Sequence, residues 1–136
     1  MAAISMNWWA VIVAAIAYMA LGAVWYSPPL FAGAWMNGIG KTKEQIAAGF
    51  SPVTYVWALI LSFLVAYGIA RIYVWAKLAT VWDGIVLGLL AGICFVLTSM
   101  GVNDLFEQRP RLLSAINILY HLVGFILIGV IIGAWH

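Results

Sequence analysis

Four long stretches of apolar residues, separated by short polar segments, are the dominant pattern along this chain. They run from about Asn7 to Tyr26, Pro52 to Tyr73, Thr80 to Val102 and Leu112 to Trp135. Each is close to the roughly 20 residues that an α-helix needs to cross a bilayer. The pattern therefore predicts an all-α fold, a bundle of four transmembrane helices that forms a single domain over residues 1–136.

The first apolar stretch ends at two consecutive prolines, Pro28 and Pro29. Proline lacks a backbone N–H and disfavours helical conformation in the residue before it, so the first helix should stop at Tyr26 or Ser27. Apolar side chains then recur at helical spacing from Leu30 to Trp35, in a segment too short to span. We expect an interfacial helical segment here, because indole and phenol rings favour the boundary between lipid and water. This interfacial motif comprises Trp25, Tyr26, Pro28, Phe31 and Trp35.

Two capping boxes mark further helix starts. Thr42 is followed three residues later by Gln45, which predicts a second short surface helix ending at Gly49. Thr80 is followed in the same way by Asp83, at the start of the third long helix. In both pairs the threonine hydroxyl should accept a hydrogen bond from the backbone amide three residues later. The later side chain should accept one from the backbone amide of the threonine.

The start and the end of the second long helix carry their own signals. Ser51 stands before Pro52, the combination of a capping hydroxyl and a proline at the first helical position. Arg71 is expected in the last turn, where its charge suits the negative end of the helix.

Glycine recurs every four residues in the third long stretch. In lipid, small residues at this spacing let two helix backbones approach closely, which replaces the hydrophobic drive available in water. Two further glycines with the same spacing occur in the fourth stretch. The predicted helix-packing face comprises Gly84, Gly88, Gly92, Gly129 and Gly133.

The composition agrees with a membrane environment. Of 136 residues, 67% are hydrophobic and 7% charged, and the mean hydropathy is +1.11. A soluble domain of this size cannot hide so much apolar surface, so lipid is the expected solvent and partner. No basic run could follow a nucleic-acid backbone, and the single Cys94 excludes an internal disulfide. Because the first five residues carry no Lys or Arg, we expect no cleaved signal peptide.

The positive charges are divided unevenly between the two expected membrane sides. Four follow the first and third helices, and two lie on the side of both termini. The positive-inside rule predicts termini outside and the more basic loops in the cytoplasm, although so small a difference leaves dual insertion open. The four charges are Lys41, Lys43, Arg109 and Arg111, and the two are Arg71 and Lys77.

A polar stripe of Ser114, Asn117 and His121 lies along the predicted fourth helix. His121 is near the membrane midplane, where ionisable groups are rare and usually face the interior of a bundle. One interpretation is a site for a proton, a ligand, haem or a pigment. The structural interpretation, which we favour, is a neutral histidine bonded to a neighbouring helix. Its candidate partners are Tyr18, Ser62, Tyr67, Thr98 and Ser99.

The most polar segment, residues 103–111, joins the third and fourth helices. Its acids and arginines could form an ionic cluster that gates a path or binds a partner. Alternatively, Asp104 caps the next helix with Glu107 three residues later, and the arginines anchor the loop to lipid phosphates. The cluster comprises Asp104, Glu107, Arg109 and Arg111.

The string from Gly22 to Trp35, GAVWYSPPLFAGAW, resembles a bacterial integral-membrane family known as domain of unknown function 1761. Asn7-Trp8 and Asn103-Asp104 extend the likeness over essentially the whole chain. The sequence departs from the family pattern at Ala32, which separates the phenylalanine from the glycine that usually follows it directly. The resemblance implies a small four-helix protein of the bacterial inner membrane, and it implies no substrate, cofactor or catalytic residue.

No phosphate-binding loop, nucleophile elbow, zinc-ligand pair or Ser-His-Asp pattern is present, so we expect neither catalysis nor a metal or other cofactor. The favoured hypothesis is a non-enzymatic protein that packs with itself or as an accessory subunit, through Gly84, Gly88 and Gly92. A second hypothesis is a small homo-oligomeric transporter or channel. The first helix of this chain, however, lacks the carboxylate on which small multidrug transporters rely. A third is a haem or pigment carrier through His121.

Overall fold

The computed structural model describes residues 5–136, which form helices and contain no strand within that range. Four helical segments are long and apolar enough to cross a membrane: α1 (Trp8–Trp25), α4 (Pro52–Trp75), α5 to α6 (Val81–Phe106) and α7 (Arg111–Ala134). Two short helices, α2 (Ala32–Ile39) and α3 (Lys43–Gly49), join α1 to α4. The predicted all-α architecture is therefore confirmed. The signal-peptide expectation concerns Met1 to Ile4, which lie outside the described residues.

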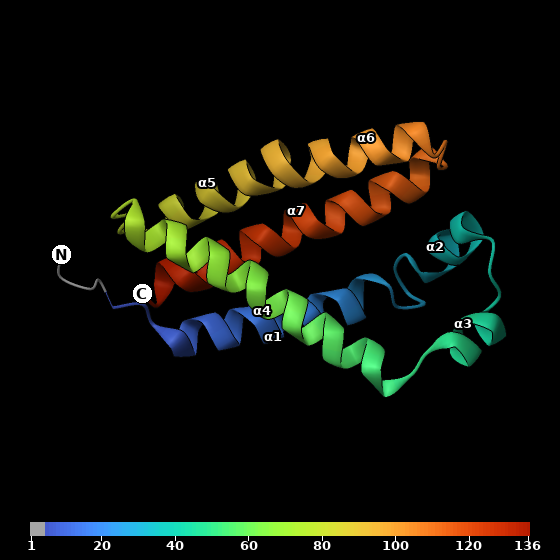
Figure 1. Ribbon diagram of the computed structural model, residues 1–136, viewed down its shortest axis with the longest axis horizontal. Coiled ribbons are helices and arrows are strands. Elements are labelled where there is room, and N and C mark those ends of the chain that lie inside the picture. Colours follow the sequence, from blue (N-terminus) through green and yellow to red (C-terminus); the bar gives the residue numbers. More distant parts are fainter. Residues whose placement is uncertain (1–4) are drawn as a thin grey trace.

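The long helices pack side by side in a fixed order. The third span, α5 to α6, lies along α7, α7 also packs on α1, and α1 packs on α4 (Figure 1). The start of α1, the C-terminus and the turn between α4 and α5 lie at one end of the molecule (Figure 1). The short helices α2 and α3 and the connection between α6 and α7 lie at the other end (Figure 1). We call these the terminal end and the loop end.

The third span is longer and less regular than predicted. It contains α5 (Val81–Ala91), a π-helical stretch η1 (Gly92–Leu97) and α6 (Thr98–Phe106). The Thr98 hydroxyl donates to the carbonyl oxygen of Cys94 at 2.7 Å, within this widened stretch. The helix ends at Phe106 rather than about Val102, so residues expected in a polar loop form its last turn.

Side-chain caps mark three helix starts within residues 5–136, those of α1, α3 and α5. Both capping boxes, Thr42 with Gln45 and Thr80 with Asp83, are present as predicted. Ser51 occupies the cap position before Pro52, but its side chain makes no capping hydrogen bond. The sequence identified where α4 begins, while the expected role of the Ser51 hydroxyl was wrong.

Helices α1 and α4 contact each other mainly toward the terminal end. Ala10 and Ala14 of α1 and Ala66 of α4 are fully buried, and Ala70 is 1% exposed. Alanines permit close helix packing because their side chains are small. Every buried residue of α4 lies at Ser62 or later, so the two helices share their core in one half only.

Candidate functional site

The glycine face lies between α5 and α7 of the same chain. A Cβ on Gly84 would overlap the carbonyl oxygen of Gly129, and a Cβ on Gly129 would overlap that of Gly84. Gly88 faces the Phe125 carbonyl in the same way, and Gly133 would bring a Cβ within 2.8 Å of the Val81 Cα. The two backbones therefore touch through glycine, without intervening side chains.

Gly92 extends this face against the side chain of Leu122. All five glycines of the predicted packing face are thus in contact with a helix of their own chain. This overturns one part of the favoured hypothesis, in which Gly84, Gly88 and Gly92 receive another protein. The face is already covered by α7, so a partner has to use another surface.

The polar stripe of α7 meets tyrosines of α1. The Tyr18 hydroxyl is hydrogen-bonded to Nδ1 of His121, and the Tyr26 hydroxyl donates to Oδ1 of Asn117 at 2.8 Å. Tyr120, which sequence reasoning missed, donates to the Tyr18 carbonyl oxygen at 3.1 Å. These hydrogen bonds join α7 to α1 and to Tyr26, the residue that caps the end of α1.

Aromatic rings enclose this hydrogen-bonded group. The rings of Tyr18 and Tyr120 stack with their centroids 5.1 Å apart, and His121 lies 5.0 Å from Tyr120. Tyr18 is 5% exposed, and Phe125 packs edge-on against its ring. Among the described residues no group of three His, Cys, Asp or Glu side chains could hold a metal ion. This arrangement orients His121 through Nδ1.

Ser114 does not join the group around His121. It lines a separate hollow of about 420 Å³ at the loop end, together with Asp104 and Arg109. The polar stripe predicted from spacing is therefore divided between two environments, because its members are separated by almost two helical turns.

The interfacial motif contacts the first half of α7. The Trp25 indole donates to the Ile116 carbonyl oxygen at 3.1 Å and lies 4.8 Å from the Phe31 ring. Tyr26 meets the Trp35 ring edge-on at 5.4 Å between centroids. The exposed prolines end α1, and α2 packs back against α7. The sequence located this motif but not the helix that it contacts.

The charged residues near the loop end form a small ionic cluster. Arg109 Nε lies 2.7 Å from Glu107 Oε2 and 3.6 Å from Asp104 Oδ1. The hydrogen bond that Arg109 Nε donates to the Glu107 carboxylate raises the pKa of the Arg109 guanidinium, which therefore keeps its positive charge. Arg111 forms no ion pair within residues 5–136.

The structure excludes the proposed capping role of Asp104. Its carboxylate belongs to the last turn of α6, whereas a capping acid belongs at the start of a helix. The third helix was predicted to end at about Val102, four residues too early, and Asp104 was therefore assigned to the start of the next helix.

Three hollows that share lining residues follow one another from the gap between α1 and α4 to the short helices α2 and α3, and together we call them the α1–α4 groove. The first, of about 340 Å³, lies between Ile12, Ile16, Leu59 and Phe63. The second, of about 640 Å³, shares Ile16 and Leu59 and extends to Tyr26 and Phe50. The third, of about 560 Å³, shares Tyr26 and Phe50 and reaches Trp35 and Lys43.

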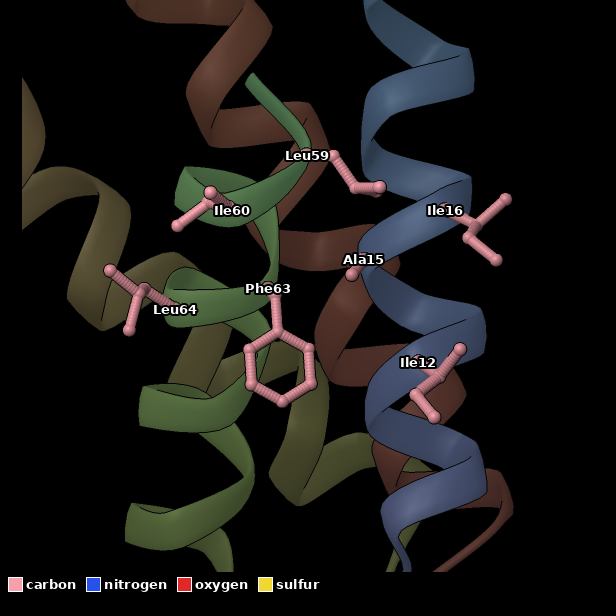
Figure 2. A pocket seen from close by; sticks show the side chains of 7 residues that line it. All are labelled: Ile12, Ala15, Ile16, Leu59, Ile60, Phe63 and Leu64. Carbon is pink, nitrogen blue, oxygen red and sulfur yellow. The ribbon is translucent and has the colours of Figure 1, made fainter. Parts of the chain in front are cut away.

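Figure 2 shows the inner part of this groove. Ala15 of α1 faces the gap toward α4, and Leu59 and Phe63 extend from α4 beside it. The small side chain of Ala15 leaves space that a larger residue would fill. Sequence reasoning missed the groove, since it depends on the separation of two helices.

Comparison with known proteins gives one match. The family model described as a protein of unknown function, DUF1761, matches residues 9–133. No curated protein and no solved structure matches the chain.

Proposed function

From the premise that this chain belongs to the DUF1761 family, we propose that it is a non-enzymatic integral membrane protein that packs with a second copy of itself. Four apolar helices long enough to span a membrane are compatible with a membrane protein. One observation supports self-packing: the first ten residues of α4 include none that is buried. These ten of its 24 residues therefore add nothing to the buried core of their own chain.

The outward side of this half-helix is uniformly apolar. Val53, Val56, Trp57 and Leu61 are each 57–59% exposed. Val56 and Trp57 follow Val53 by three and four residues, and Leu61 follows Trp57 by four, which places these side chains on one face of α4. A face without charge suits contact with an identical face. Paired copies with closed symmetry are the commonest oligomers.

Trp57 distinguishes this surface from ordinary lipid-facing positions. Most tryptophans of the chain lie at helix ends, where the interfacial belt accounts for them. Trp57 instead lies in the second turn of α4 and supplies a large rigid ring to the outward face. Such rings supply a large contact area at low conformational cost, which favours association.

The transporter alternative receives less support from the geometry. Tyr18, Asn117 and His121 would have to line a passage in that mechanism. Their side chains instead take part in hydrogen bonds between α1 and α7. These bonds favour a structural role, in which polar groups join helices inside lipid.

Disulfide crosslinking tests the proposed pairing. In a Cys94→Ser background, Val56→Cys places one thiol on the outward face of α4. Oxidation in membranes should then produce a covalent dimer on a non-reducing gel. Val102→Cys is the matched control, because Val102 is similarly exposed on α6.

A dimer from Val56→Cys alone supports the proposal. Absence of crosslinking at Val56, or equal crosslinking at Val102, would overturn it. Mass measurement in mild detergent adds a second readout, in which Trp57→Ala should shift the distribution from dimer to monomer. A stable complex with a different membrane protein and no dimer would also refute self-packing and indicate an accessory subunit.

A further inference from the structure

We propose that the α1–α4 groove binds one anionic phospholipid, with an acyl chain between α1 and α4 and the phosphate group at Lys43. This inference takes the four helices to be membrane-embedded, but it does not require the second copy proposed above. The dimer face and the groove adjoin on α4, because Ile60 and Leu64, three residues after Trp57 and Leu61, line the inner hollow. Val53, Val56, Trp57 and Leu61 line none of the three hollows.

The length of the groove matches one leaflet. Its α4 wall runs from Thr54 to Leu64, and the ten steps between these residues span about 15 Å at 1.5 Å per step. The hydrocarbon core of a bilayer is about 30 Å thick, so this distance is half of it. An acyl chain entering from the loop end would therefore finish near the midplane.

The closed end of the groove argues against a helix as occupant. Beyond the groove, toward the terminal end, α1 and α4 share a core in which Ala10 and Ala66 are fully buried. A transmembrane helix crosses both leaflets, so only half of its length could contact this groove. A lipid occupies one leaflet, which is the length that the groove offers.

The groove is apolar inside and polar at its outer end. Leu59 and Phe63 line the inner hollow, whereas Tyr26, Trp35 and Lys43 line the outer one. This order from apolar to polar is that of a phospholipid from chain to headgroup. Tyrosine and tryptophan carry hydrogen-bond donors suited to the headgroup region.

Charge selects the headgroup. Lys43 is the one charged side chain among the described residues that line the three hollows. Glu44, its neighbour in α3, and Lys41 line none of them. A single ammonium group in the lining attracts phosphate, and a lipid of net negative charge gains more than a zwitterionic one.

Native mass spectrometry tests this proposal. The intact protein is reconstituted with equal amounts of phosphatidylglycerol and phosphatidylcholine that carry the same acyl chains, and is then released from the bilayer. One phosphatidylglycerol per chain should be retained, with about fivefold preference over phosphatidylcholine. Lys43→Gln should abolish the preference, whereas the control Lys41→Gln should leave most of it.

A second variant tests the acyl-chain path. Ala58→Trp fills the middle hollow and should reduce retention of both lipids severalfold. The control Ala115→Trp, at an exposed position of α7 outside the groove, should not. Equal retention of the two lipids by the native protein would overturn the proposal. Equal effects of the two lysine variants on the lipid preference would also overturn it. So would unchanged lipid retention by an Ala58→Trp variant that keeps its helical content. Failure of the Val56→Cys crosslink would leave these lipid results unaffected, so the two proposals can fail separately.

Discussion

Gly84 of α5 and Gly129 of α7 meet backbone to backbone, and each lies where the other could not tolerate a Cβ. This reciprocal contact is at the centre of the most extensive helix pair in the protein. Close approach of this kind gains dispersion energy along both helices, which is the main source of helix association in lipid. The pair of α5 and α7 is therefore the structural base on which the rest of the bundle packs.

Replacing Gly84 by alanine should destabilise the protein, because the new Cβ would overlap the Gly129 carbonyl group and force the helices apart. We expect a loss of about 1–3 kcal/mol, typical of an overfilled core. The measurement is thermal unfolding in detergent, followed by circular dichroism. Gly68→Ala is the control, since a Cβ there meets nothing within 4 Å. A melting temperature of Gly84→Ala equal to or above that of the native protein would contradict the close contact.

Replacing Tyr18 by phenylalanine should also destabilise the bundle. The change removes the hydroxyl that holds His121 and leaves a part-buried ring nitrogen without its partner. Removing one member of such a pair costs about 1–2 kcal/mol. Tyr55→Phe is the matched control, because Tyr55 is exposed and its hydroxyl forms no hydrogen bond within the described chain. Equal melting temperatures for the two variants would mean that the bond contributes nothing.

Truncating His121 to alanine separates a structural role from ligand binding. If the histidine serves to join α1 and α7, the variant should unfold at a lower temperature. The visible absorption spectrum of the purified native protein should then contain no haem or pigment band. A variant of unchanged stability that loses such a band would instead establish a carrier function.

The capping box at Thr80 should contribute more to stability than the hydroxyl at Ser51. Thr80 accepts from the Asp83 amide, whereas the Ser51 side chain makes no capping bond. Thr80→Ala should therefore cost about 1 kcal/mol, and Ser51→Ala should have a smaller effect. Chemical or thermal unfolding of the two variants in the same detergent measures the difference. A larger loss at Ser51 would contradict the assigned caps.

Orientation can be tested with reporters at the C-terminus, which lies at the same end as the turn containing Lys77 (Figure 1). The charge difference predicts that this end faces away from the cytoplasm. A C-terminal alkaline phosphatase should be active and a C-terminal green fluorescent protein dark. The opposite pattern would reverse the predicted orientation, and activity of both reporters would indicate dual insertion.

Helix positions could be predicted because their causes are local. An apolar run requires a helix in lipid, since each backbone donor must be satisfied within the segment. Prolines and capping boxes then determine the ends, as at Thr42 and Thr80. The prediction failed at Val102, where apolarity weakens gradually and no proline follows until Pro110. The π-helical stretch at Gly92–Leu97 also left no local signal.

The sequence by itself determined four apolar helices, their main starts and a glycine-rich face suited to close packing. Only the tertiary structure decided which helix covers that face, and it assigned α7 of the same chain to it. It also decided that Tyr18 bonds to His121, a residue 103 positions away, and that α1 and α4 separate to leave a groove. Residue spacing defines the faces of one helix, but pairing depends on the simultaneous fit of all four, which no local stretch encodes.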